Sequence, residues 1–259
     1  MSNNLDLKSL LADPNILDVL EAEQDRRARN KIDSLFPDTG PLRRELYDKH
    51  MEFFRASKEH DETLFLAANK VGKTVAGGAA ATYHSTGLYP HWWEGKRFDH
   101  PTVGWACNNT NNDCRDINQL ELLGPPGQIG TGLIPADRII MTRPKPSIPD
   151  GIGTAYIRHV TGGQSMIQFK SYDAGRENFQ GRNIHWIWPD EEVPDDIYIE
   201  MTMRIMVTQG IIFLTYTPIL GLTPVTVEFL TTAVNKESLP IKFTGSEKRG
   251  ISMPGKEGE

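Results

Sequence analysis

The segment from Ala67 to Thr74 has the residue types and the spacing that phosphate binding needs. It reads AANKVGKT, follows the apolar run 63–66 and leads into the Ala- and Gly-rich run 75–81. A strand, a loop and a helix in this order form the context that a P-loop requires. Backbone N–H groups of such a loop hold phosphate oxygens together with the positive end of the helix. The segment therefore predicts a nucleotide site.

Individual residues of this loop have distinct expected roles. Lys73 would reach the β and γ phosphates, and the Thr74 hydroxyl would coordinate Mg²⁺. The first loop position is usually glycine, so Ala67 fits only where the backbone needs no positive φ angle. The residues expected to contact the nucleotide are Ala67, Ala68, Asn69, Lys70, Val71, Gly72, Lys73 and Thr74.

An acidic cluster follows a second apolar run, 184–188, after a single proline. A buried strand that ends in acids is the other half of a nucleoside triphosphatase site. Asp190 would hold Mg²⁺ there, and Glu191 would orient or deprotonate the attacking water. The alternative is a strand followed by a charged helix N-terminus, where acids favour the helix dipole. The presence of the P-loop favours the catalytic interpretation.

A third segment, 210–218, reads GIIFLTYTP and predicts a buried strand that ends in hydroxyl groups. Thr215, Tyr216 and Thr217 would lie at the tip of a strand beside the site. Hydroxyls in that place can sense the γ-phosphate and couple its loss to motion.

These motifs together resemble the ATPase domain of the large terminase subunit of tailed bacteriophages. The resemblance rests on AANKVGKT, GRENFQGRNIHWIWPDEE and FLTYTP, and it extends over roughly residues 42–230. It implies an ATP- and Mg²⁺-dependent motor that moves double-stranded viral DNA into an empty capsid in the host cytoplasm. It also implies a portal protein and a small terminase subunit as partners, and a homo-oligomeric ring that monomers form on the portal.

The fold class predicted from these segments is α/β, a RecA-like P-loop domain with a mainly parallel sheet flanked by helices. The site would lie at the carboxyl ends of the strands. Residues 1–40 are expected to form a helical arm, 41–235 the ATPase domain, and 236–259 a linker towards a C-terminal nuclease domain, which the family resemblance implies. A further strand is expected at 239–243. Nuclease activity is not expected, because no cluster of spaced aspartates for two metal ions follows residue 230.

Composition narrows the function classes. The net charge of −6 argues against a broadly basic nucleic-acid binder, although a motor that holds DNA loosely needs only a few local cations. No apolar run approaches the roughly 18 to 20 residues of a membrane helix, and the N-terminus lacks the pattern of a signal peptide. Cys107 and Cys114 are interpreted as free thiols in a reducing cytoplasm.

Two further residues are candidates for contacts with the nucleotide. Arg115 is expected in the first turn of a helix that runs to Leu123, where a cation opposes the helix dipole. It would therefore serve as an arginine finger to a neighbouring subunit's ATP, with a solvated surface arginine as the alternative. Tyr47, in a helix expected at 42–58, would stack on the base or simply pack within its helix.

Other cations could contact DNA. Arg138, Arg143 and Lys145 belong to a proline-rich segment that is either a DNA-facing loop or a solvated one. Arg176 and Arg182 flank a Phe-Gln-Gly sequence and would touch DNA or a neighbouring subunit.

Two other functions compete with the motor. A helicase would need a second RecA-like domain, and only about 40 residues follow Pro218. A nucleotide-binding assembly module that clamps onto a portal without turnover is the other, and only Ala67 and Pro189 support it.

Overall fold

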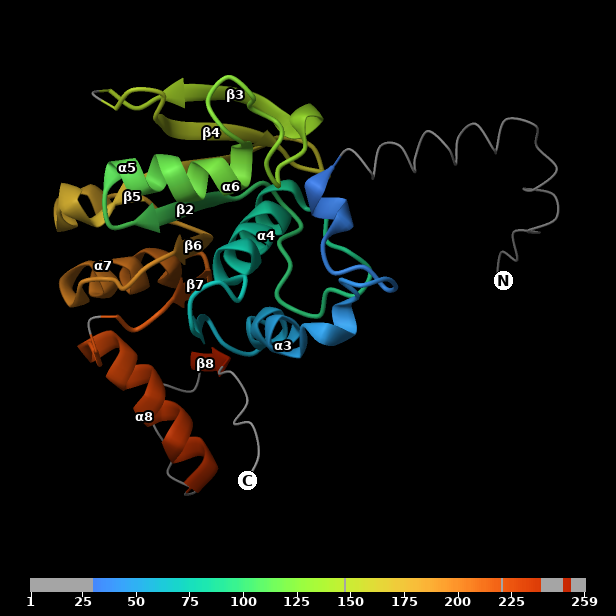
Figure 1. Ribbon diagram of the computed structural model, residues 1–259. Helices are drawn as coiled ribbons and strands as arrows, with labels where there is room; N and C mark the ends of the chain where they lie inside the picture. Colours follow the sequence, from blue (N-terminus) through green and yellow to red (C-terminus); the bar gives the residue numbers. More distant parts are fainter. Residues whose placement is uncertain (1–29, 147, 220, 239–248, 253–259) are drawn as a thin grey trace, which may run out of the picture.

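The computed structural model describes residues 30–146, 148–219, 221–238 and 249–252, which surround one eight-stranded sheet in the order β3-β4-β5-β2-β6-β7-β1-β8. Figure 1 shows β3 and β4 at one end of this sheet and β8 at the other. The strands are β1 (Glu62–Leu66), β2 (Val103–Asn108), β3 (Ile139–Pro144), β4 (Ile152–Arg158), β5 (Gln164–Ser171), β6 (Trp186–Pro189), β7 (Ile211–Tyr216) and β8 (Arg249–Ser252).

The sheet is mainly parallel, as predicted. The pairs that join β5, β2, β6, β7, β1 and β8 are all parallel, whereas β3, β4 and β5 pair in antiparallel fashion. The antiparallel part contains a hairpin between β4 and β5. The carboxyl ends of the parallel strands therefore meet at one edge of the sheet, where ligands of open α/β sheets bind.

The longer helices cover both faces of the sheet. They are α3 (Asp48–Ala56), α4 (Lys73–Thr86), α7 (Asp195–Met206) and α8 (Pro224–Ser238). A helical segment after β2 consists of α5 (Asn111–Asp113), the π-helical turn η3 (Cys114–Gln119) and α6 (Leu120–Leu123). Short 3-10 turns are η1 (Lys31–Ser34), η2 (Arg44–Leu46), η4 (Ala136–Arg138), η5 (Tyr172–Ala174) and η6 (Arg176–Phe179).

Two apolar cores lie on the opposite faces of the sheet, because successive strand residues point to opposite sides. Trp186 and Trp188 of β6 pack with α3, α4 and α6, whereas Ile187 between them packs with α7 and α8. The glycines of α4 permit this contact. A Cβ atom on Gly77 would lie 2.1 Å from the Trp188 indole nitrogen, so the helix approaches β6 closely only with glycine there.

One expected helix differs from the structure. The helix expected at 42–58 is divided into η2 and α3, and Leu46 of η2 is 55% exposed. In the loop at 88–93, Trp93 is buried, with its ring centroid 5.1 Å from those of Tyr83 and Phe54.

The terminal segments of the chain are described only in part. Most of the expected arm, residues 1–29, and the strand expected at 239–243 lie outside the described residues. Within the expected linker, α8 continues to Ser238 and β8 pairs with β1, so four residues of that segment belong to the sheet. Among the described residues no helix is long and apolar enough to cross a membrane.

Candidate nucleotide site

The loop between β1 and α4 has the backbone geometry of a phosphate-binding loop. Gly72 precedes the first residue of α4 and has a φ angle of 87°, in the left-handed region that favours glycine. Lys70 also has a positive φ angle, 65°. Ala67 is not among the residues with positive φ, so its side chain is compatible with the loop.

Lys73 joins the loop to β7. Its Nζ atom donates to the carbonyl oxygen of Ala68 at 2.7 Å and to Thr217 Oγ1 at 2.8 Å. Burial lowers the pKa of Lys73, and the nearby charges of Asp190 and Glu191 raise it. The ammonium group is therefore hydrogen-bonded to two oxygen atoms that phosphate oxygens could replace.

Asp190, at the end of β6, forms the centre of a buried hydrogen-bond network. Thr74 Oγ1 lies 3.0 Å from Asp190 Oδ2, and Thr215 Oγ1 donates to Asp190 Oδ1 at 2.6 Å. The Trp188 indole donates in turn to Thr215 Oγ1 at 2.7 Å. Asp190 is 3% exposed, and this burial raises the pKa of its carboxyl to about 7, although the hydrogen bonds from Thr215 and Thr74 lower it.

The residues around Asp190 suit a magnesium ion. A hydroxyl and a carboxylate are hard oxygen donors, and Mg²⁺ is usually held by one or two carboxylates together with substrate phosphates. The described residues contain no group of three or more His, Cys, Asp or Glu that could hold a metal by themselves. Thr74 and Asp190 would therefore hold Mg²⁺ jointly with a bound nucleotide.

A cavity of about 270 Å³ opens between the loop and the ends of β6 and β7. Its lining distinguishes the two glutamates. Glu191 is half-buried and lines the cavity, whereas Glu192 is 9% exposed and does not. Burial raises the pKa of Glu191, Lys73 lowers it, and Glu192 and Asp113 raise it further. The cavity is lined by Asn69, Lys70, Gly72, Lys73, Thr74, Val75, Asp190, Glu191, Thr215 and Thr217.

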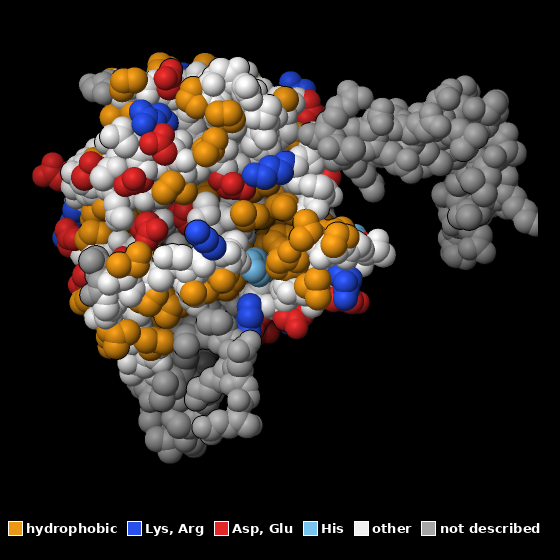
Figure 2. All heavy atoms as spheres, viewed as in Figure 1, with side chains coloured by type: hydrophobic (Ala, Val, Ile, Leu, Met, Phe, Trp, Pro, Cys, Tyr) orange, Lys and Arg blue, Asp and Glu red, His pale blue; other side chains and the backbone are white. Residues whose placement is uncertain are grey.

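A second cavity, of about 420 Å³, adjoins the loop on the side of α3. Figure 2 shows hydrophobic side chains gathered beside a histidine on this face of the molecule. Tyr47 lines the cavity, as its predicted contact with the base requires, with its ring centroid 5.5 Å from that of Phe36. The other lining residues are Ser34, Leu35, Leu42, His50, Lys70, Val71, Gly72 and Val75.

Sequence reasoning missed Phe36 and His50. Phe36 belongs to a segment interpreted only as a chain break, and His50 is buried against Phe65 at a ring distance of 5.0 Å. Burial lowers the pKa of His50, which keeps its ring neutral near pH 7. No local pattern marks either residue, because the fold brings both to the loop from outside the P-loop motif.

The three predicted coupling residues point to both faces of β7. Thr215 contacts Asp190, and Thr217 Oγ1 lies 2.9 Å from the Ala67 carbonyl oxygen and 2.8 Å from Asn69 Oδ1. The Tyr216 hydroxyl is instead 2.8 Å from Thr226 Oγ1 in α8. The strand thus connects the nucleotide cavity to a helix on the other face of the sheet.

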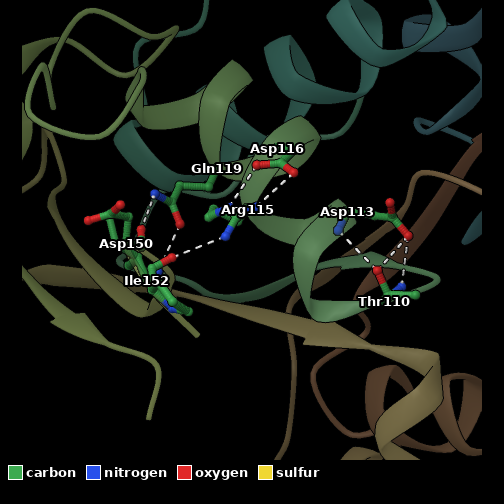
Figure 3. A network of polar contacts seen from close by, with 8 residues as sticks. Thr110, Asp113, Arg115, Asp116, Gln119, Asp150 and Ile152 are labelled. Carbon is green, nitrogen blue, oxygen red and sulfur yellow. Dashed lines mark hydrogen bonds and ion pairs between the residues drawn. The ribbon is translucent and has the colours of Figure 1, made fainter. Parts of the chain in front are cut away.

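Arg115 lies away from this cavity. The helical segment begins after Thr110, which forms a capping box with Asp113, so Arg115 follows the first turn that was predicted for it. Its guanidinium points to the carboxylate of Asp116 (Figure 3) and donates to it at 2.7 Å and 3.0 Å. It also donates to the Pro149 carbonyl oxygen at 3.2 Å. The dipole argument for Arg115 therefore weakens, and its role as a finger in trans stays a prediction.

Of the two arginines that flank the Phe-Gln-Gly sequence, Arg176 has a structural partner. It contacts the buried carboxylate of Glu200 at 3.1 Å, and Arg204 contacts the same carboxylate at 2.7 Å. The ion pair between Arg176 and Glu200 joins η6 to α7. Arg182, the other arginine, is exposed on the surface.

Comparisons with known proteins agree with this geometry. The family "Terminase large subunit, T4likevirus-type, N-terminal" matches residues 64–244. The large terminase subunit of Salmonella phage P22 is 32% identical over 235 residues, which cover 83% of this chain and 45% of that protein. The chain thus spans a little less than half of the length of this relative.

Two solved structures share the fold. The ATPase domain of the Thermus phage P74-26 large terminase superposes with a TM-score of 0.50 at 13% identity, covering 75% of each chain. The large terminase of the thermophilic bacteriophage D6E gives a TM-score of 0.50 at 10% identity, covering 79% of this chain and 44% of that one. The family match extends over most of the described residues, so the chain belongs to the terminase large subunits and corresponds to their N-terminal region.

Proposed function

We propose that this chain is an ATP-hydrolysing motor domain that moves double-stranded viral DNA into a procapsid. One observation carries the proposal. The P-loop is hydrogen-bonded to the residues that follow two other strands of the sheet, through Lys73 to Thr217 after β7 and through Thr74 to Asp190 after β6. A purely structural loop would not place a lysine, a hydroxyl and two acids around one cavity.

The chemistry proposed for these residues is hydrolysis of ATP. Lys73 would exchange Ala68 and Thr217 for the β and γ phosphates. Mg²⁺, held by Thr74 and Asp190, would neutralise charge on the phosphates. Glu191 would accept the proton of the attacking water, because it lines the cavity, unlike Glu192, and its raised pKa suits a general base.

The contacts of β7 support coupling of hydrolysis to motion. When a phosphate takes Lys73, Thr217 loses one of its partners. Tyr216, the last residue of β7, is hydrogen-bonded to Thr226 in α8. A shift of this strand end would thus be transmitted to a helix on the far face of the sheet.

The proposed partners follow from family membership. They are double-stranded DNA, a portal protein and a small terminase subunit, with monomers that assemble into a ring on the portal in the host cytoplasm. The relatives are large terminases, and one of the similar structures is a large terminase ATPase domain, which supports the motor more than either competing function.

ATP turnover and translocation on DNA test the proposal against its competitors. The chain, assembled on a portal, should hydrolyse ATP and displace a triplex-forming strand from duplex DNA, and Lys73→Ala should do neither. Separation of the two DNA strands would favour the helicase. Nucleotide binding with no turnover in the assembled state would favour the assembly module.

A further inference from the structure

A third cavity, at the same edge of the sheet as the nucleotide cavity, is lined by cations and by no acid. It has a volume of about 320 Å³ and lies between β3, β4, β5 and the turns after β5. Arg143, Lys145 and Lys170 line it, and none of its lining residues is Asp or Glu. This is unusual in a chain whose acids outnumber its Lys and Arg by 34 to 28.

The cations of this cavity are held by neutral groups. Lys170 Nζ lies 4.5 Å from the Trp105 ring centroid and donates to the Asn178 carbonyl oxygen. Lys145 Nζ donates to the Phe169 carbonyl oxygen at 3.2 Å. The Arg143 guanidinium lies 5.1 Å from the centroid of a tyrosine ring in β4. Within the described part of the chain, none of the three forms an ion pair with a carboxylate.

The charges in this cavity repel one another. Burial lowers the pKa of Lys170, and the charges of Lys145 and Arg182 lower it further. An anion that enters the cavity would relieve this repulsion and would form charge-assisted hydrogen bonds, which are stronger than neutral ones. None of the residues that line the cavity supplies a carboxylate for such bonds.

The position of the cavity connects it to the nucleotide site. Lys170 pairs with Cys107 of β2, and Cys107 pairs with Pro189 of β6, the residue before Asp190. Two strand spacings, about 10 Å, therefore separate the end of β5 from the end of β6. An anion bound here would lie at the edge of the sheet where nucleotide turnover is proposed to act.

We propose that Arg143, Lys145 and Lys170 bind phosphate groups of the double-stranded DNA backbone. The inference rests on the proposed function, and it assigns the surface on which the DNA is held. A duplex carries one charge per about 1.7 Å of its axis, so it presents several phosphates to a cluster of cations. Such contacts carry no sequence information, which suits a motor that must advance along any sequence.

Salt-dependent DNA binding tests this assignment. The double variant Arg143→Gln/Lys145→Gln removes two of the three cations and keeps Lys170, whose ammonium lies over the buried rings of Trp105 and Phe179. Fluorescence anisotropy of a labelled duplex, between roughly 50 and 200 mM salt, should show about tenfold weaker binding at the low end of the range. The slope of log K against log salt should fall by about 1.8, because each lost phosphate contact removes about 0.9.

Matched variants separate this effect from folding and from overall charge. Arg158→Gln removes an exposed arginine from the opposite end of β4, and it should leave DNA affinity unchanged. Arg143→Lys/Lys145→Arg keeps both charges and should restore binding to within about threefold. Affinity for a fluorescent ATP analogue, which uses the other cavity, should be the same in all variants.

Four results would overturn the assignment. They are a double variant with wild-type affinity and slope, an equal loss in Arg158→Gln, no DNA binding by the wild type, or loss of inorganic phosphate binding with DNA binding unchanged. The last result would make the cavity a site for free phosphate. Wild-type protein that binds DNA through this cavity yet never hydrolyses ATP would refute the motor and leave the DNA site standing.

Discussion

The nucleotide cavity and the cation-lined cavity lie at two ends of the same sheet edge, and they differ in the sign of their buried charge. At the nucleotide end, burial of Asp190 raises the pKa of a carboxyl to about 7, so an anion there lacks sufficient positive charge around it. At the antiparallel end, burial and neighbouring cations lower the pKa of Lys170, so a cation there lacks negative charge. A ligand of the opposite sign would move the pKa of each group back towards its usual value.

This difference indicates what each end binds. Lys73 alone does not balance Asp190 and Glu191, and a divalent cation would complete the charge at that end. The cations around Lys170 need an anion, and nothing in the described residues supplies one. The sign of an unbalanced, desolvated charge therefore predicts the sign of the ligand.

The most severe test of the nucleotide end is Lys73→Ala. ATP affinity and turnover should fall at least about 10²-fold, because the developing phosphate charge loses its point cation. Lys170→Ala is the matched control, since it removes a lysine from the other end and should leave ATP affinity intact. Wild-type turnover by Lys73→Ala, measured as phosphate release, would refute the assignment of the loop.

Arg115, which belongs to neither cavity, tests whether the nucleotide end is complete within one chain. A finger supplied in trans contributes about 10³ to 10⁵ in rate in well-studied P-loop enzymes. Arg115→Ala should lower the assembled turnover and leave the nucleotide affinity of the monomer unchanged. Mixed with Glu191→Gln subunits, it should recover part of the activity.

If co-assembled mixtures recover nothing, Arg115 does not act in trans. Attention would then move to Arg182, or to Lys70 acting within its own subunit.

Substitution of the glutamates identifies the acid that serves the cavity. Glu191→Gln should retain ATP binding and lose about 10²- to 10⁴-fold in turnover, because the amide cannot accept the proton of water. Glu192→Gln should remain active, since Glu192 does not line the cavity. An inactive Glu192→Gln beside an active Glu191→Gln would shift the assignment by one residue.

The last prediction concerns stability rather than turnover. The pKa of Asp190 is about 7 in the folded protein and 3.8 for a free aspartate, so without Mg²⁺ and nucleotide its contribution to stability falls as the pH rises from about 4 to 7. Asp190→Asn should therefore raise the free energy of unfolding above pH 7, by at most about 4 kcal/mol.

The gain should vanish near pH 4, where the carboxyl of the folded protein is already protonated. Thermal unfolding of both proteins from pH 4 to 8 provides the measurement. A gain in Tm that does not depend on pH would show that Asp190 is not desolvated as its burial indicates.

The sequence predicted the local motifs well because their signals are local. The loop at 67–74, the strand before the acids and the strand before Thr217 each follow from short patterns. Phe36 and His50 could not be found in this way, because they reach the P-loop only through the packing of α3 and its preceding turn.

The interpretation of other residues also changed, because tertiary contacts decide what their side chains touch. Arg176 resembled a DNA contact until the fold placed it on the buried Glu200, which lies 24 residues away in the chain. Arg143 and Lys145 could equally have been solvated. Only the pairing of β3, β4 and β5 places them around one cavity with Lys170.

The sequence by itself determined the family, the fold class and the set of groups that suit phosphate chemistry, because residue types and short spacings carry that information. The tertiary structure decided which of those groups share a cavity, which glutamate lines it, and where charge is left unbalanced. Burial and distance control hydrogen bonds and pKa, and both arise from contacts between segments far apart in the chain.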